Sequence, residues 1–266
     1  MRVVRGDSIA THALLVIAAV IATVPLVAIV VTSLKSADGS LDLANYAKAW
    51  KQGGFASALA SSAVVAVTVV AVTAAVSCLA GYAFAHMRVP GGKLILGILL
   101  VGLVLPYEVT VLPLYRMLAG WGLVDTYWAL ILPQIGLSVP LGVLWMRSFF
   151  AAVPVELLEA ARIDGVARFR ILQSILMPIA WPAVATLSTI LFLFTWNEFL
   201  LALILVPQNQ AVQTAPLSLS FFSGAEHGAQ PNVTAAAAVL VALPIVIIYV
   251  VLQRRLITGL TEGAVK

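Results

Sequence analysis

Long apolar runs separated by short polar segments dominate the pattern of this chain. The runs are continuous rather than alternating, and they lie at residues 13–31, 63–84, 94–114, 127–146, 179–206 and 233–252. At 1.5 Å per residue, about 20 apolar residues in a helix cross the roughly 30 Å hydrocarbon core of a bilayer. Strands of a membrane barrel would be shorter and would alternate in polarity. The pattern therefore predicts an all-α, polytopic membrane bundle of about six transmembrane helices, forming one domain over residues 1–266.

The first, third and fifth runs differ from a simple span in length or composition. The first is longer than the 7–15 apolar residues of a signal peptide, so we expect an uncleaved first span. The third contains Pro106 and Glu108, and the fifth is long enough to tilt or to end early near Asn197. Residues 36–55, which lie between the first two runs and include several aromatic side chains, predict a short amphipathic helix on the outer surface.

The composition excludes a soluble domain, and the basic residues set the orientation. Hydrophobic residues make up 62% and charged residues 10% of the chain, against roughly 45–50% and 25% in soluble domains. The net charge of +4 does not indicate nucleic acid binding, because the basic residues flank the apolar runs. A cytoplasmic N-terminus leaves four basic residues outside (Lys35, Lys48, Lys51, Arg116) and puts eleven inside (Arg2, Arg5, Arg88, Lys93, Arg147, Arg162, Arg168, Arg170, Arg254, Arg255, Lys266). We therefore expect both termini in the cytoplasm.

Residues that could carry enzymatic chemistry do not form a recognisable constellation. The chain has no phosphate-binding loop, and its three histidines lack the spacing of metal ligands. Its single cysteine, Cys78, lies inside an apolar run, where a small packing residue is the expected role. We expect no catalytic residue, no metal site and no cofactor bound by this chain.

Ionisable side chains inside apolar runs are candidates for a translocation pathway, because exposing them to lipid is costly. Glu108 and Glu198, with the neighbouring Asn197, fall in the outer half of the predicted bundle. They could line a polar path for a substrate. Alternatively, they could reach the membrane surface or form an ion pair, for example between Glu108 and Arg116.

The longest polar interruption is the cytoplasmic segment 151–178. Residues 154–165 read PVELLEAARIDG, which predicts a helix that starts near Pro154 and ends at Gly165, where glycine can adopt a left-handed conformation. A second short helix is expected over residues 166–177, running toward Pro178 and then into the fifth span. Small side chains at Ala160 and Ala161 would permit close docking of a partner protein, and Glu159 would offer a charge to a basic group. An interfacial helix resting on lipid is the alternative, but the acidic first helix does not favour it.

This segment resembles the EAA loop of ABC-importer permeases, of which the carbohydrate branch with the maltose-type second permease is the most similar. Other stretches resemble that branch in the same order along the chain. They are residues 113–115 (PLY), 122–126 (GLVDT), 130–133 (LILP), 196–199 (WNEF) and 259–266 (GLTEGAVK). The resemblance implies the type I ABC-importer permease architecture in a bacterial or archaeal cytoplasmic membrane.

The resemblance also implies roles for particular residues and partners. A coupling helix would dock in a cleft of an ATPase subunit through Glu159, Ala160, Ala161, Asp164, Gly165 and Phe169. The C-terminal tail, residues 254–266, would contact the ATPase dimer through Thr261, Glu262, Gly263 and Ala264, or it would be a frayed end. The expected partners are a second permease subunit, two ATPase subunits that bind ATP and Mg, an extracytoplasmic solute-binding protein, a small-molecule substrate and the lipid bilayer, with no nucleic acid.

The resulting hypothesis is a permease subunit, without enzymatic activity of its own, of a binding-protein-dependent importer for a sugar or oligosaccharide. Two alternatives stay open. The same architecture could import a solute that is not a sugar, or the chain could be an ion-coupled carrier or channel that uses Glu108 and Glu198 without ATPase partners.

Overall fold

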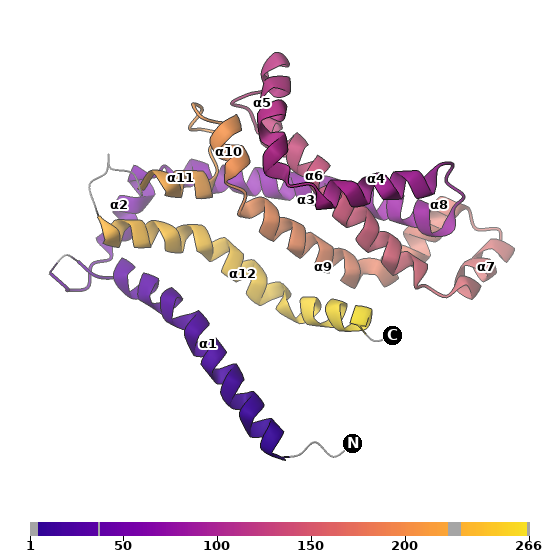
Figure 1. Cartoon of the computed structure of the whole chain (residues 1–266), viewed down its shortest axis with the longest axis horizontal. Coiled ribbons are helices and arrows are strands. Elements are labelled where there is room, and N and C mark those ends of the chain that lie inside the picture. The colour runs from indigo at the N-terminus through magenta and orange to yellow at the C-terminus, as the bar shows by residue number, and fades with distance from the viewer. Residues whose placement is uncertain (1–4, 37, 223–229, 265–266) are drawn as a thin grey trace. The chain divides into compact units, whose positions relative to one another are not determined.

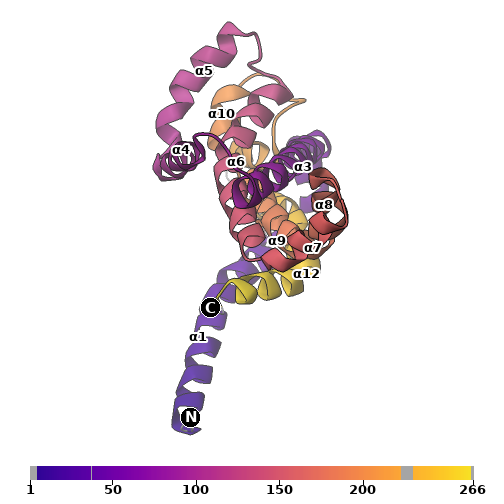
Figure 2. The same ribbon diagram turned by 90° about the vertical axis from the view of Figure 1, so that its right-hand side faces the viewer.

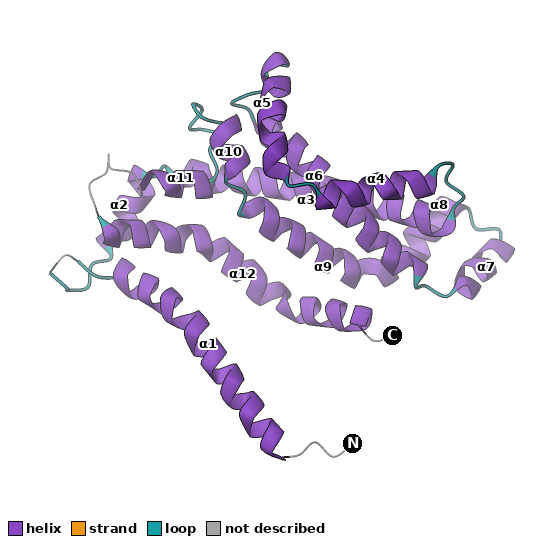
Figure 3. Ribbon diagram, in the orientation of Figure 1, coloured by secondary structure: helices purple, strands orange, loops and turns teal. Residues whose placement is uncertain are grey.

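The described residues of the computed structural model are 5–36, 38–222 and 230–264, with side chains described between residues 11 and 251. Within these ranges the chain consists of helices joined by loops and turns, as Figure 3 shows, with one isolated bridge between Lys35 and Leu41. Five helices are long and apolar enough to cross a membrane, and a bent helix pair raises the number to six if it counts as one span. The structure thus confirms the all-α, multi-span fold class.

One compact unit contains residues 1–56 and 218–244. It holds α1 (Arg5–Ser33), α2 (Ala44–Gln52), the end of α11 (Ala215–Phe222) and the first part of α12 (Pro231–Ala264). The predicted helix within residues 36–55 is α2. The side-chain amide of Asn45 caps the end of α1 by donating to the carbonyl oxygens of Ser33 and Lys35, at 3.1 and 2.8 Å. Hydrogen bonds donated by Ser40 hold the pKa of Asp38 below its usual value in the connecting loop.

The second compact unit contains residues 57–217 and 245–266; Figure 1 labels its helices. The single-domain prediction for the whole chain stays a prediction. The elements that lie wholly in this unit are α4 (Gly92–Val104), a 3₁₀ turn (Tyr107–Thr110), α5 (Val111–Gly120), α6 (Tyr127–Ala151), α7 (Val155–Ile163), α8 (Arg168–Ile171), a π turn (Leu172–Leu176), α9 (Met177–Trp196) and α10 (Leu200–Leu205). Most of α3 (Phe55–His86) and parts of α11 and α12 belong to it as well.

The third predicted span is not one continuous helix, and it counts as a span only if the bent pair of α4 and the segment 107–120 is taken as one. The chain turns by 95° between α4 and the helical segment that leads into α5, a bend visible in Figure 2. Leu105 and Pro106 both adopt extended backbone conformations at the break. The residue before a proline is pushed out of the helical region, and proline has no N–H to continue the helix.

The fifth span also differs from its predicted boundaries. A continuous helical stretch runs from Arg168 to Trp196. The second cytoplasmic helix, expected over residues 166–177, therefore begins at Arg168 and continues into the fifth span as predicted. A π turn lies directly before Pro178, where the missing N–H disturbs the regular hydrogen-bond ladder. The early end near Asn197 is confirmed, because Asn197 caps α9 and the chain resumes as α10 at Leu200.

Close packing joins α3 to α6. A β-carbon added to Gly142 would collide with Ser77 of α3, and one added to Gly81 would come within 2.7 Å of the Met146 side chain. Small residues permit such a close approach of two helix backbones in a membrane. Ser77 and Gly81 of α3 therefore serve helix packing.

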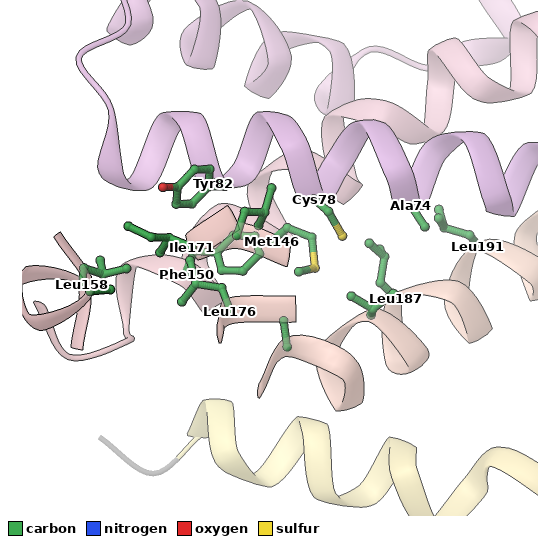
Figure 4. Close-up of a cluster of buried hydrophobic side chains, with 14 residues drawn as sticks. Ala74, Cys78, Tyr82, Met146, Phe150, Leu158, Ile171, Leu176, Leu187 and Leu191 are labelled. Carbon is green, nitrogen blue, oxygen red and sulfur yellow. The ribbon is translucent and has the colours of Figure 1, made fainter. Parts of the chain in front are cut away.

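Two apolar clusters lie on this scaffold. The first, shown in Figure 4, joins α3, α6, α7 and the helix from Arg168 to Trp196, and it contains Cys78 as a buried packing residue. We call it the coupling cluster; its members include Tyr82, Met146, Phe150, Leu158, Ile171, Leu172, Leu176, Leu187 and Leu191. We call the second the outer cluster; its buried residues come from α3, α5, α6, α10 and α11 and include Val65, Leu118, Leu130, Leu201, Leu205 and Val212.

Candidate coupling site

The helix α7 forms where the sequence predicts the first cytoplasmic helix. Pro154 occupies the N-cap position and α7 runs from Val155 to Ile163, one residue later than a helix starting at Pro154. Glu156 lies in the first turn, where a negative charge complements the positive end of the helix dipole. Leu158 and Ala161, three residues apart, are its buried side chains, so one face packs inward and the rest stays exposed.

Gly165 ends α7 as predicted. Its φ of +74° lies in the left-handed region, and its N–H donates to the carbonyl oxygen of Arg162 at 3.0 Å. The N–H of Val166 donates to the carbonyl oxygen of Ala161, also at 3.0 Å. These two bonds are the Schellman pattern, which satisfies the last carbonyl groups of a helix. Because a side chain at this φ would be strained, Gly165 fixes the direction in which the chain leaves the helix.

The coupling cluster anchors α7 to the bundle (Figure 4). Leu158 is 1% exposed and belongs to the same cluster as Phe150 at the end of α6 and Ile171 near the start of the next long helix. Burying a leucine side chain contributes about 1.5–3 kcal/mol. Movement of α7 is therefore tied to movement of the helices that it packs on.

The end of α3 adds polar contacts to this anchor. The hydroxyl of Tyr82 donates to the carbonyl oxygen of Arg168 at 3.2 Å, and His86 Nε2 lies 2.9 Å from the carbonyl oxygen of Phe150. The rings of Tyr82 and Phe150 meet edge to face with centroids 6.2 Å apart. Sequence reasoning gave Tyr82 and His86 no role, and their positions near the end of an apolar run are the one signal that could have indicated it.

The exposed face of α7 and the following turn holds most of the predicted coupling residues. Glu159, Ala160, Asp164, Gly165 and Phe169 are all exposed. Apolar side chains accompany them, with Ile163 86% and Phe169 65% exposed. A carboxylate beside a small residue and exposed apolar groups is the chemistry of a protein docking surface with a basic counterpart.

Ala161 does not lie on that exposed face, and neither does Leu158. Ala161 is 5% exposed and packs in the coupling cluster next to Val166. The expectation that both alanines offer a close-docking surface therefore holds for Ala160 alone. The small side chain of Ala161 instead lets α7 approach the helices beneath it.

The predicted pathway residues lie at the two helix breaks. Glu108 follows the break at Pro106 and is exposed, and it does not form the alternative ion pair with Arg116. Glu198 is half-buried and accepts a hydrogen bond from the N–H of Leu201 at 2.9 Å, so it caps α10. The Tyr107 hydroxyl lies beside the carboxylate of Glu198 and interacts with that of Glu108 as well. The structure thus brings the two acidic residues to one neighbourhood.

Asn197 is exposed at the end of α9, where its side-chain amide donates to the carbonyl oxygen of Leu193 at 2.8 Å. A pocket of about 300 Å³, which Asn197 does not line, lies between α5 and α6. Its lining is almost entirely apolar: Thr110, Leu114, Met117, Leu118, Trp121, Leu132, Pro133, Gly136 and Leu137. Such a lining offers few hydrogen bonds to a polar solute, so the polar residues at the breaks are the better candidates for a pathway.

The predicted ATPase-contacting tail lies at the end of α12. The backbone of α12 extends to Ala264, but the side chains of Thr261, Glu262, Gly263 and Ala264 lie outside the described residues. Among the residues that the structure describes, no three His, Cys, Asp or Glu side chains are grouped so that they could hold a metal ion. The tail contact stays a prediction.

Membrane-crossing helices joined to an exposed docking helix are typical of a transport subunit that works with partner chains. Residues 76–262 match the family of binding-protein-dependent transport system inner membrane components. The chain therefore belongs to this family, whose members are multi-pass permease subunits of ABC importers.

Individual relatives are consistent with this membership. The trehalose transport system permease protein SugB of Mycobacterium tuberculosis is 33% identical over 84% of this chain and 81% of its own length. The diacetylchitobiose uptake system permease protein NgcG of Streptomyces coelicolor is 29% identical over 95% of this chain and 87% of its own. A permease chain in the crystal structure of a bacterial ABC transporter that imports the acidic polysaccharide alginate has the same fold, with a TM-score of 0.77 at 22% identity, over 96% of this chain and 98% of that one.

Proposed function

We propose that this chain is one permease subunit of an ATP-driven importer for a sugar or oligosaccharide. The observation that carries the proposal is the exposed face of α7, held on the bundle by Leu158 and Ala161. The names of its relatives support the substrate class: trehalose, diacetylchitobiose and, for a relative from Agrobacterium fabrum, sulfoquinovosyl glycerol are all carbohydrates or carry one.

The coupling step follows from the packing of α7. Glu159, Ala160 and Phe169 would dock on an ATPase subunit, and ATP-driven closure of two such subunits would displace α7. Because α7 shares the coupling cluster with α3, α6 and the helix up to Trp196, its displacement would move those helices together. The bundle would then alternate between inward and outward openings through a bistable arrangement.

The energy source in this proposal is a partner. The sequence has no phosphate-binding loop, so ATP and Mg would bind to the two ATPase subunits and not to this chain. A second permease subunit would complete the pathway, and an extracytoplasmic solute-binding protein would deliver the substrate. The positive-inside distribution of Lys and Arg supports a cytoplasmic location for both termini and α7.

Uptake by the assembled complex tests the function. Proteoliposomes that contain both permeases, the ATPase subunits and the loaded binding protein are expected to accumulate labelled sugar when supplied with ATP, and not when supplied with an ion gradient alone. Unlabelled sugars should compete, whereas peptides or polyol phosphates should not. Uptake driven by an ion gradient without ATPase subunits would instead identify the ion-coupled carrier.

Glu198, Asn197 and Glu108 are proposed to line the solute pathway at the two breaks. Glu198→Gln keeps a side-chain oxygen that can accept from Leu201 N–H, so we expect uptake within about threefold of the unaltered protein. Glu198→Ala removes the cap, at a cost of about 1 kcal/mol, together with the polar group, and should lower uptake more. Equal uptake by both variants would argue that Glu198 is neither a pathway residue nor an important cap.

A further inference from the structure

The segment from Gly122 to Thr126 has no role in the mechanism above, yet its backbone is tightly specified. Gly122, with φ +68°, ends α5: its N–H donates to Ala119 and that of Leu123 donates to Leu118, both at 3.0 Å. The hydroxyl of Thr126 donates to the carbonyl oxygen of Leu123 at 2.6 Å, immediately before α6 begins. These bonds fix the turn between α5 and α6.

Asp125 is the unusual residue of this turn. Its φ of +62° is positive, which is true of no other non-glycine residue within the described ranges. The left-handed conformation is unfavourable for side chains with a β-carbon, although Asp and Asn tolerate it best. Such a conformation persists where surrounding contacts stabilise it, and residues of this kind cluster at functional sites.

Four hydrogen bonds join Asp125 to the end of α10 and to the outer loop that follows it, one to Leu205 and three to the loop. One carboxylate oxygen, Oδ1, accepts from the N–H groups of Gln208 and Asn209, at 2.9 and 3.0 Å. The backbone N–H of Asp125 donates to the carbonyl oxygen of Leu205 at 2.9 Å. Its carbonyl oxygen accepts from Nδ2 of Asn209, also at 2.9 Å. Hydrogen bonds to an ionised carboxylate are about twice as strong as neutral ones, so one side chain holds a loop more than 80 residues away in the sequence.

The same loop is tied to two more helices. The carbonyl oxygen of Ala211 accepts from the hydroxyls of Ser61 in α3 and Tyr127 in α6, at 2.9 and 3.3 Å. The N–H of Ala215 donates to the hydroxyl of Ser62 at 2.8 Å. Beneath these bonds lies the outer cluster, in which α5, α6 and α10 pack together with Val212 from the loop. The outer end of this unit is therefore a single packed body.

Two helices of this outer body, α5 and α10, follow breaks in the chain, whereas α3 and α6 run unbroken from the outer cluster to the coupling cluster. The 95° bend at Pro106 lies between α4 and α5, and the interruption at Asn197 lies between α9 and α10. Residues at element ends are where hinge motions are absorbed. Without hydrogen bonds that join α10 and its following loop to the turn between α5 and α6, α10 could move independently of these two helices whenever α9 moves.

We propose that Asp125 is a positioning residue of the transport cycle, which latches the loop 206–212 to the turn between α5 and α6 so that α5, the start of α6 and α10 move as one body. The inference rests on the proposed function for its link to transport. The latch converts displacement of α9, which shares the coupling cluster with α7, into displacement of the whole outer body instead of α10 alone.

Substitutions at Asp125 separate the backbone conformation from the carboxylate. Asp125→Gly keeps access to the positive φ but removes the acceptor, whereas Asp125→Asn keeps both. In proteoliposomes with the complete transporter, we expect the sugar imported per ATP hydrolysed to fall about tenfold for Asp125→Gly and to stay within about twofold for Asp125→Asn. Asn209→Ala should lower the ratio by about threefold and add little to Asp125→Gly, because both act on one latch.

A second readout reports the latch without transport. Val212 is buried in the outer cluster, so Val212→Cys, in a chain whose Cys78 is replaced by Ala, should react slowly with a membrane-impermeant maleimide. Adding Asp125→Gly should accelerate labelling about tenfold, and adding Asp125→Asn should not. Unchanged labelling and an unchanged transport ratio for Asp125→Gly, or equal damage by Gly and Asn, would overturn the proposal. Failure of ATP-driven uptake in the unaltered protein, with labelling as expected, would reject the proposed function and leave the latch standing.

Discussion

Reversing the charge of Glu159 is expected to abolish ATP-driven uptake while the membrane bundle still inserts and folds. Glu159 is exposed on α7 and makes no contact that the packing of the bundle requires. Removing one member of a buried interfacial charge pair costs about 2–5 kcal/mol, and Glu159→Lys adds repulsion from a basic partner. Since about 1.4 kcal/mol is a factor of ten in affinity, the ATPase subunits should no longer copurify with the permease.

Glu156→Lys is the matched control for this experiment. Glu156 carries the same charge, lies one turn earlier on the same helix and is also exposed. Its reversal loses a favourable interaction with the helix dipole of about 0.3–1 kcal/mol, so the ATPase should still copurify. Loss of copurification with both variants would indicate a nonspecific effect of charge on this surface, and retention with both would reject docking through Glu159.

Removing the anchor of α7 should uncouple the transporter without dissociating it. Leu158 is buried in the coupling cluster, and truncation of such a leucine to alanine typically costs about 2–5 kcal/mol because a cavity remains. In Leu158→Ala the exposed face of α7 is unchanged, so we expect the ATPase to bind and to hydrolyse ATP. The sugar imported per ATP should fall about tenfold, measured by uptake and phosphate release in the same proteoliposomes.

The neighbouring leucine provides the comparison for the anchor. Leu157 is 39% exposed on the same helix, so Leu157→Ala deletes the same atoms without opening a cavity in the coupling cluster. Any effect should appear in ATPase affinity rather than in sugar imported per ATP. If the two variants lower this ratio equally, the rigid link from α7 to the bundle is not what transmits the motion.

The helical class and five of the membrane-crossing helices could be predicted because continuous apolar runs leave few other structures in a bilayer. The end of α7 at Gly165 was equally predictable, since a local backbone requirement is visible in one residue. The bend at Pro106 was not, because prolines such as Pro133 and Pro140 lie inside α6 without ending it. Neighbouring helices can satisfy the backbone groups that a proline frees, and the sequence does not reveal where they do so.

Only part of the site could be predicted, because the rest depends on tertiary packing. Ala160 and Ala161 are neighbouring residues of the same type, and their different roles depend on which face of α7 meets the coupling cluster. Asp125 belongs to a motif that the sequence analysis noted, but its partners Gln208 and Asn209 are more than 80 residues away. Contacts of this kind depend on tertiary packing and leave no local pattern.

Cross-linking of α7 to the ATPase tests the central claim most directly. Ile163, at the end of α7, and Leu41, in the loop between α1 and α2, are 86% and 85% exposed, so cysteines at these positions are matched in accessibility. With Cys78 replaced by Ala, each variant is assembled with its partners and treated with a thiol-to-amine cross-linker. We predict that Ile163→Cys forms a covalent adduct with an ATPase subunit and that Leu41→Cys, which the proposed topology assigns to the outer side, does not. An assembled complex in which Ile163→Cys remains unlinked while Leu41→Cys reaches the ATPase would contradict the account.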